Sequence, residues 1–143
     1  MYSRIVVGTD GSGTAAGAVS VAADLARRSG AVVHLVNAFQ LSPSALGVPM
    51  GAVVVDEAAL GGALLEEQAA EVLAKTAESL GDLAIEQHAG RGPAADVIVA
   101  VADAVEADLI VVGSKGMNRR ILGSIPNSVA HNAPCAVLIV KTS

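Results

Sequence analysis

The sequence predicts a doubly wound α/β fold, with a five-stranded parallel sheet and helices on both faces. Five short apolar runs alternate with four segments of helical periodicity, the pattern of such folds. Hydrophobic residues make up 52% of the chain, yet it contains one Phe, one Tyr and no Trp. The core must therefore consist of Val, Ala, Leu and Ile, which suits β-branched strands packed under alanine-rich helices. A length of 143 residues is typical of one domain, 1–143.

In the first half of the chain we expect two parallel strands joined by a helix. The first strand is expected at 4–8 and the second at 31–37, and the intervening helix should run to about Arg28, with Gly30 closing it. A crossover of that length implies a right-handed connection between parallel strands. The next segment, 38–56, lacks periodicity, and a lid over a ligand and a disordered insert explain it equally well.

The second half continues the alternation. A helix is expected from about Glu57 to Leu80, secure only from Ala63 because Gly61 and Gly62 weaken its first turn. The alternating pattern at 83–88 suits an edge strand. The remaining elements are expected as a helix at 94–104, a strand at 109–112, a helix at 125–131 and a strand at 136–140.

A glycine-rich loop between the strand at 109–112 and the next helix is the first candidate site. Gly113, Gly116 and Gly123 leave backbone N–H groups uncovered by side chains, and Ser124 is a possible N-cap for the helix. Free amides and the positive end of a helix dipole favour an anion. Phosphate is the obvious ligand.

The Thr9-Asp10-Gly11 turn after the first strand is the second part of that site. In a doubly wound sheet, ligands bind beyond the carboxyl ends of the strands where the connections leave in opposite directions. If the first and fourth strands are neighbours, this turn faces Gly113. Asp10 would then contact ribose hydroxyls or help to hold a metal near phosphates; the alternative is an ordinary turn or capping aspartate.

Two other residue types could carry chemistry. His34 lies within a strand and could be a ligand or a base, but no carboxylate lies near it in the sequence, which favours a structural role. Cys135, the one cysteine, excludes an internal disulfide and begins an apolar run, which favours a buried structural thiol.

Charge and pattern argue against several function classes. The net charge of −5 disfavours a general nucleic-acid binder, and no apolar run reaches the ~18 residues that span a bilayer. Because the N-terminus leads directly into a strand, we expect a soluble, cytoplasmic protein. The first turn lacks the dinucleotide fingerprint, and no Gly-Lys-Ser/Thr signature or Ser/His/Asp set is recognisable. An enzyme is therefore not expected, beyond slow ATP hydrolysis or autophosphorylation.

Three separated motifs resemble those of the universal stress protein family. They are Ile5 to Ser12, Val111 to Gly116, and Gly123-Ser124 continuing through Pro134-Cys135 to Val140. The resemblance covers essentially the whole chain as a single domain. It implies strand order 3-2-1-4-5, a homodimer joined through the final strand at 136–140 and, in one large subgroup, ATP binding.

The resemblance also implies roles for individual residues. Asp10, next to Thr9, would contact the ribose or, indirectly, an ATP-bound Mg²⁺ ion, and backbone groups of Val36 would meet the adenine. The ribose and phosphates would be surrounded by residues of the glycine loop: Gly113, Gly116, Gly123 and Ser124.

One departure from the family pattern leaves the ligand open. The nucleotide-binding subgroup has nine residues between the second and third glycines, whereas six separate Gly116 from Gly123 here. Either Arg119 and Arg120 supply compensating charge for ATP, or the shorter loop suits a smaller nucleotide such as cyclic AMP, or no nucleotide binds. In the last case the chain would be a dimeric interaction module.

Overall fold

The computed structural model describes residues 1–40, 55–114 and 123–141. Its nine elements alternate strand and helix throughout, with these bounds: β1 Arg4–Gly8, α1 Gly13–Ser29, β2 Val32–Phe39, α2 Val55–Ser79, β3 Ile85–Arg91, α3 Ala94–Ala104, β4 Leu109–Gly113, α4 Ser124–Asn132 and β5 Ala136–Val140.

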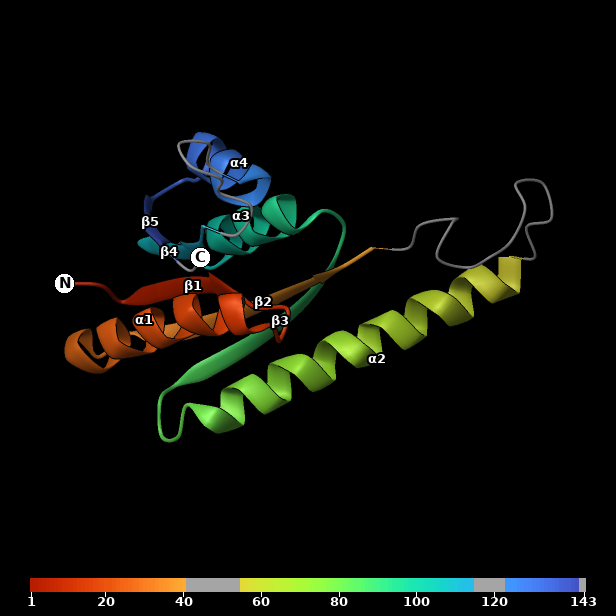
Figure 1. The fold of residues 1–143 in the computed structure, drawn as a ribbon, viewed down its shortest axis with the longest axis horizontal. Helices are drawn as coiled ribbons and strands as arrows, with labels where there is room; N and C mark the ends of the chain where they lie inside the picture. The colour runs from red at the N-terminus through yellow and green to blue at the C-terminus, as the bar shows by residue number, and fades with distance from the viewer. Residues whose placement is uncertain (41–54, 115–122, 142–143) are drawn as a thin grey trace.

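The five strands form one parallel sheet in the order β3-β2-β1-β4-β5, which confirms the expected fold class and order. Figure 1 shows α1 and α2 on one side of the sheet and α3 and α4 on the other. The central strand β1 is fully enclosed, since Ile5, Val6 and Val7 are all 0% exposed. Both faces of β1 are therefore hydrophobic, as is typical of a central strand in a parallel sheet.

Side-chain alternation divides the core into two layers. Ile5 and Val7 face α1 and α2 and join a cluster rich in alanine, whereas Val6 faces α3 and α4. Small residues such as Ala18, Ala22 and Ala26 are nearly inaccessible on α1. They let the helix lie close to the strands, so a core without large aromatic side chains can still be closely packed.

Several boundaries differ from the prediction by one to three residues, among them those of α2 and β3. The helix α2 begins at Val55 and runs through Gly61 and Gly62 without interruption, so the tertiary fold overrides the weak propensity of glycine there. Strand β3 extends to Arg91, beyond the predicted end at His88, because its pairing with β2 continues to the register Phe39↔Arg91. The edge position predicted for this strand is correct.

No helix in the described part of the chain is both long enough and apolar enough to cross a membrane. Much of the connection predicted at 38–56 lies outside the described residues, so the choice between a lid and a disordered insert stays open.

Gly90 marks the closest approach of β3 to α3, and its replacement gives the first prediction. A Cβ atom there would lie 2.4 Å from Cγ1 of Val97, a stiff β-branched side chain on α3. Gly90→Ala should lower the free energy of unfolding by about 1–3 kcal/mol, measured by urea denaturation. The matched control is Gly13→Ala, whose Cβ meets no heavy atom within 4 Å. Equal stabilities of the two variants would contradict the close approach.

Candidate functional site

The candidate site is a crevice beyond the carboxyl ends of β1 and β4. These strands pair directly, and the chain leaves β1 toward α1 on one face and β4 toward α4 on the other. Neighbouring strands with oppositely directed connections leave a gap between them. The gap encloses about 140 Å³, and its walls come from β1, β2, β4 and the first turns of α1, α3 and α4.

The sequence-predicted residues of the first turn do lie in this crevice. Thr9 is buried, and its N–H donates to the carbonyl oxygen of Val36 at 2.8 Å. Thr9 Oγ1 accepts from the N–H of Gly11 at 3.2 Å. These bonds hold the turn against the end of β2, so that Val36 and Thr9 line one wall together.

Asp10 has the turn role that the sequence left as an alternative. Its Oδ1 accepts from the N–H of Ser12 at 2.8 Å, and Ser12 Oγ in turn accepts from the N–H of Ala15 at 3.2 Å as the N-cap of α1. Asp10 is nonetheless exposed and lines the crevice. A carboxylate offers about four acceptor positions, so a turn contact and a ligand contact are compatible.

The opposite wall begins at the end of β4. Gly113 lines the crevice, and the following N–H, from the buried Ser114, donates to the carbonyl oxygen of Val140 at 2.8 Å. The sheet therefore holds the chain in place up to residue 114. Three predicted site residues, Gly116, Arg119 and Arg120, lie outside the described residues.

The start of α4 differs from the prediction. Gly123 is the N-cap, with extended φ and ψ of −59° and 161°, and Ser124 is the first helical residue rather than the cap. Within residues 1–40, 55–114 and 123–141, no side chain caps this helix, whereas Ser12 caps α1. Pro126 fits the first turn because the N–H it lacks would have no partner within the helix. The first amides of a helix and the positive end of its dipole suit an anion.

Gly123 is buried and Ser124 is exposed, but neither lines the crevice directly. The next two residues, Ile125 and Pro126, do so. The structure thus brings Thr9, Asp10, Val36 and Gly113 together and places the start of α4 beside them.

Sequence reasoning missed the apolar walls of the crevice. Ala94 and Ile98 belong to the expected helix at 94–104, and Val112 ends the expected strand at 109–112, but none of the three was a candidate site residue. The position of these residues in the expected fold could have identified them. Every helix that follows a strand of a parallel sheet begins at the carboxyl edge, so the first turns of α1 and α3 had to lie there.

A second, larger hollow of about 690 Å³ lies between α1 and α2 and shares Thr9, Asp10 and Ser12 with the crevice. It contains two cationic residues, Arg27 and Lys75. Arg27 donates to the carbonyl oxygen of Leu80 at 3.3 Å, which joins the two helices. This hollow lacks both the end of β4 and the start of α4, and so we favour the smaller crevice as the site.

Comparison with known proteins places the chain in a family. The model of the Universal stress protein family matches residues 1–141. The chain is 33% identical to universal stress protein MJ0531 of Methanocaldococcus jannaschii, over 99% of this chain and 83% of that protein.

Solved structures agree with the sequence matches. One is a universal stress protein in complex with cAMP, with a TM-score of 0.74 and 33% identity over 99% of both chains. Another is the universal stress protein from Archaeoglobus fulgidus in complex with dAMP, with a TM-score of 0.64 and 26% identity over 98% of both chains. The predicted family is thereby confirmed: this chain belongs to the universal stress protein family.

Proposed function

We propose that this protein is a regulatory dimer that binds an adenine nucleotide in the crevice beyond β1 and β4. The observation that carries the proposal is the meeting of an apolar cleft with the start of α4, where the N-cap is a glycine and no described side chain caps the helix. Two structural relatives that match nearly all of this chain are complexes with adenine nucleotides, cAMP and dAMP. The expected cytoplasmic location stays a prediction, and the proposal includes no nucleic-acid or membrane partner.

The chemistry of the walls orients the ligand. Val36, Ala38 and Ile98 give the β2 side an apolar surface suited to a purine ring. Asp10 stands where it can accept from ribose hydroxyls. Gly113 and the first amides of α4 lie on the β4 side and receive the phosphate.

The charge of the described walls favours a ligand with one phosphate. None of the described residues that line the crevice is Lys or Arg, and Asp10 adds a negative charge. The N-terminus of a helix supplies only about half a positive charge. That field suits the single negative charge of cAMP better than the several negative charges of a triphosphate. The short loop, with six residues in place of nine, also favours the smaller nucleotide.

ATP, with Mg²⁺ held indirectly by Asp10, is the second candidate. The sequence supports it through Arg119 and Arg120, which precede α4 and could add the positive charge that the described walls lack. The third alternative, a dimer without nucleotide, leaves the crevice without a ligand.

The dimer surface proposed is the outer edge of β5. Both β3 and β5 are edge strands, but β3 carries Glu86, Gln87 and Arg91, polar residues that discourage further pairing. By contrast, β5 is entirely apolar and leaves Leu138 37% exposed. An apolar edge can be buried against a second copy of itself about a two-fold axis.

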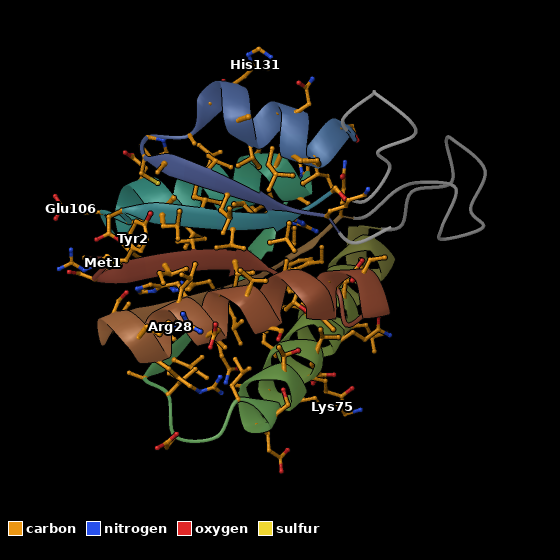
Figure 2. The ribbon with its side chains drawn as sticks, turned by 60° about the vertical axis from the view of Figure 1, so that its left-hand side comes forward. Met1, Tyr2, Arg28, Lys75, Glu106 and His131 are labelled. Carbon is orange, nitrogen blue, oxygen red and sulfur yellow. The ribbon has the colours of Figure 1, made fainter. Side chains whose placement is uncertain are left out.

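Reversal of charge at Arg119 or Arg120 tests the phosphate end of the site. Arg119→Glu and Arg120→Glu should weaken ATP binding by about tenfold or more, cAMP less and adenosine hardly at all, because the lost attraction scales with phosphate charge. Calorimetric titration measures the three affinities. The control is Arg28→Glu, with the same change in net charge at the far end of α1, where Arg28 is labelled in Figure 2. Equal losses for adenosine and ATP would place these arginines away from the phosphate.

Replacement of Leu138 tests the dimer edge. Leu138→Lys should convert the protein to monomers, because a buried, unpaired ammonium group at a symmetric edge is strongly unfavourable. Light scattering after size-exclusion chromatography gives the mass. The matched control, Leu64→Lys, changes an apolar residue of α2 that is 58% exposed, and it should remain dimeric. A Leu138→Lys dimer, or a monomeric parent protein, would rule out the proposed interface.

A further inference from the structure

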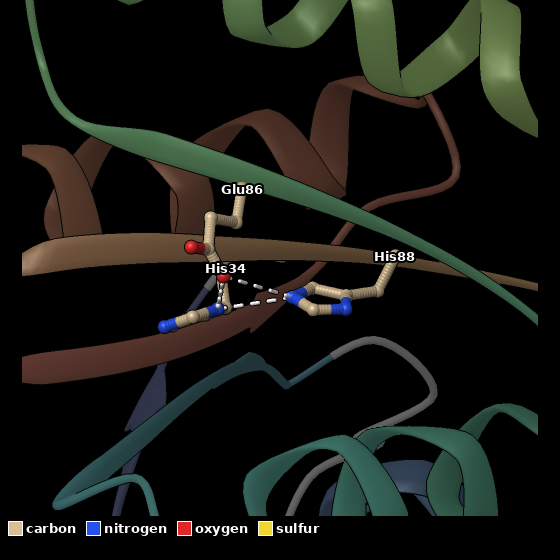
Figure 3. Close-up of side chains that lie close together, drawn as sticks. All are labelled: His34, Glu86 and His88. Carbon is tan, nitrogen blue, oxygen red and sulfur yellow. Dashed lines mark hydrogen bonds and ion pairs between the residues drawn. The ribbon is translucent and has the colours of Figure 1, made fainter. Parts of the chain in front are cut away.

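Strands β2 and β3 bring together three metal-ligating side chains outside the nucleotide crevice. His34 of β2 is in register with Glu86 of β3, and Val36 is in register with His88. Because side chains alternate along a strand, His34, Glu86 and His88 share the face that carries Val36, which packs toward α3. Figure 3 shows the three side chains directed toward one another across the two strands.

The absence of a carboxylate near His34 in the sequence was therefore misleading. Strand pairing supplies Glu86, with its Oε2 3.3 Å from His34 Nδ1. It also supplies His88, although His34 and His88 lie 54 residues apart in the chain.

The distances among the three ligand atoms match one face of a tetrahedron. His34 Nδ1 lies 3.0 Å from His88 Nε2, and His88 Nε2 lies 4.0 Å from Glu86 Oε2. Four ligands at about 2.0–2.1 Å from a zinc ion are separated from one another by about 3.3–3.4 Å. The observed separations, 3.0, 3.3 and 4.0 Å, bracket that value, so small side-chain rotations bring all three atoms to bonding distance.

Burial gives the cluster a fixed inner ligand and an accessible outer side. The side chain of His34 is 5% exposed, that of His88 27% and that of Glu86 63%. A neutral imidazole has a ring nitrogen that can donate a lone pair to a cation.

We propose that His34 Nδ1, His88 Nε2 and Glu86 Oε2 bind a zinc ion, with a water molecule completing the tetrahedron on the exposed side. Two imidazoles and one carboxylate form a ligand set that zinc accepts with an open fourth position, whereas Mg²⁺ and Ca²⁺ require oxygen ligands. Each neutral ring carries its proton on the nitrogen that does not face the ion, so one ring changes tautomer and no proton is lost.

The ion would tie the edge strand β3 to β2 at a place where polar side chains face one another. None of the three ligands lines the nucleotide crevice. The proposed zinc site can therefore be tested independently of the proposed nucleotide function.

Untagged protein, stripped with a chelator, is titrated with Co²⁺, which shows strong visible absorption in a tetrahedral site, and the Co²⁺ is then displaced by Zn²⁺. Elemental analysis should find one Zn²⁺ per chain. Zn²⁺ should raise the melting temperature of the protein, and removal of the Zn²⁺ with a chelator should reverse that rise. His88→Gln and Glu86→Gln alter accessible ligands and should each weaken Zn²⁺ at least about tenfold and abolish the cobalt spectrum.

Two controls distinguish this site from other ligands. His131→Gln removes the third histidine of the chain, which lies on α4 and is labelled in Figure 2, and Cys135→Ser removes the one thiol. Both should retain parental affinity for Zn²⁺ and the cobalt spectrum. Unchanged binding in His88→Gln, a loss caused by His131→Gln or Cys135→Ser, or no stoichiometric binding by the parent would each overturn the site and leave the cluster as a hydrogen-bonded pair of histidines.

Discussion

The pairing of β1 with β2 on one side and β4 on the other is the constraint on which the rest of the structure depends. The three strands are parallel and in fixed register, and β1 has no exposed side chain between Ile5 and Val7. Since the sheet order reverses at β1, the connections that follow β1 and β4 must leave toward opposite faces. The crevice is thus a consequence of topology, and only its walls are set by individual residues.

The two walls of the crevice differ in how their backbone N–H groups are hydrogen-bonded. On the β1 side, hydrogen bonds of the turn and of the N-cap of α1 involve Thr9, Asp10 and Ser12. These bonds hold that wall in place. On the β4 side, α4 begins at Ser124 after the N-cap Gly123, and no described side chain caps it. The N-terminus of α4 suits a phosphate, and the apolar cleft beside it suits a base, so the two match the two ends of a nucleotide. The proposed function depends on this difference between the two walls.

The sequence predicted the elements well because strong local patterns specify them, such as the apolar run in β4 and Gly30, whose φ of 72° ends α1. Strand order came from family resemblance, since local patterns do not determine it. What was missed depends on contacts between distant segments: the extension of β3 along β2 and the convergence of His34 with Glu86 and His88. A histidine with no partner in its own strand acquires two only when β3 docks beside it.

The most direct measurement of the central claim is amide chemical-shift mapping by NMR while the protein is titrated with cAMP. We predict that the N–H signals of Thr9, Gly113 and Ile125 shift together and saturate at one nucleotide per chain, because these residues line the crevice. Signals of Arg27 and Lys75, in the hollow between α1 and α2, should stay in place. Shifts confined to that hollow, or no shifts with cAMP or ATP at millimolar concentration, would contradict the assignment of the crevice as a nucleotide site.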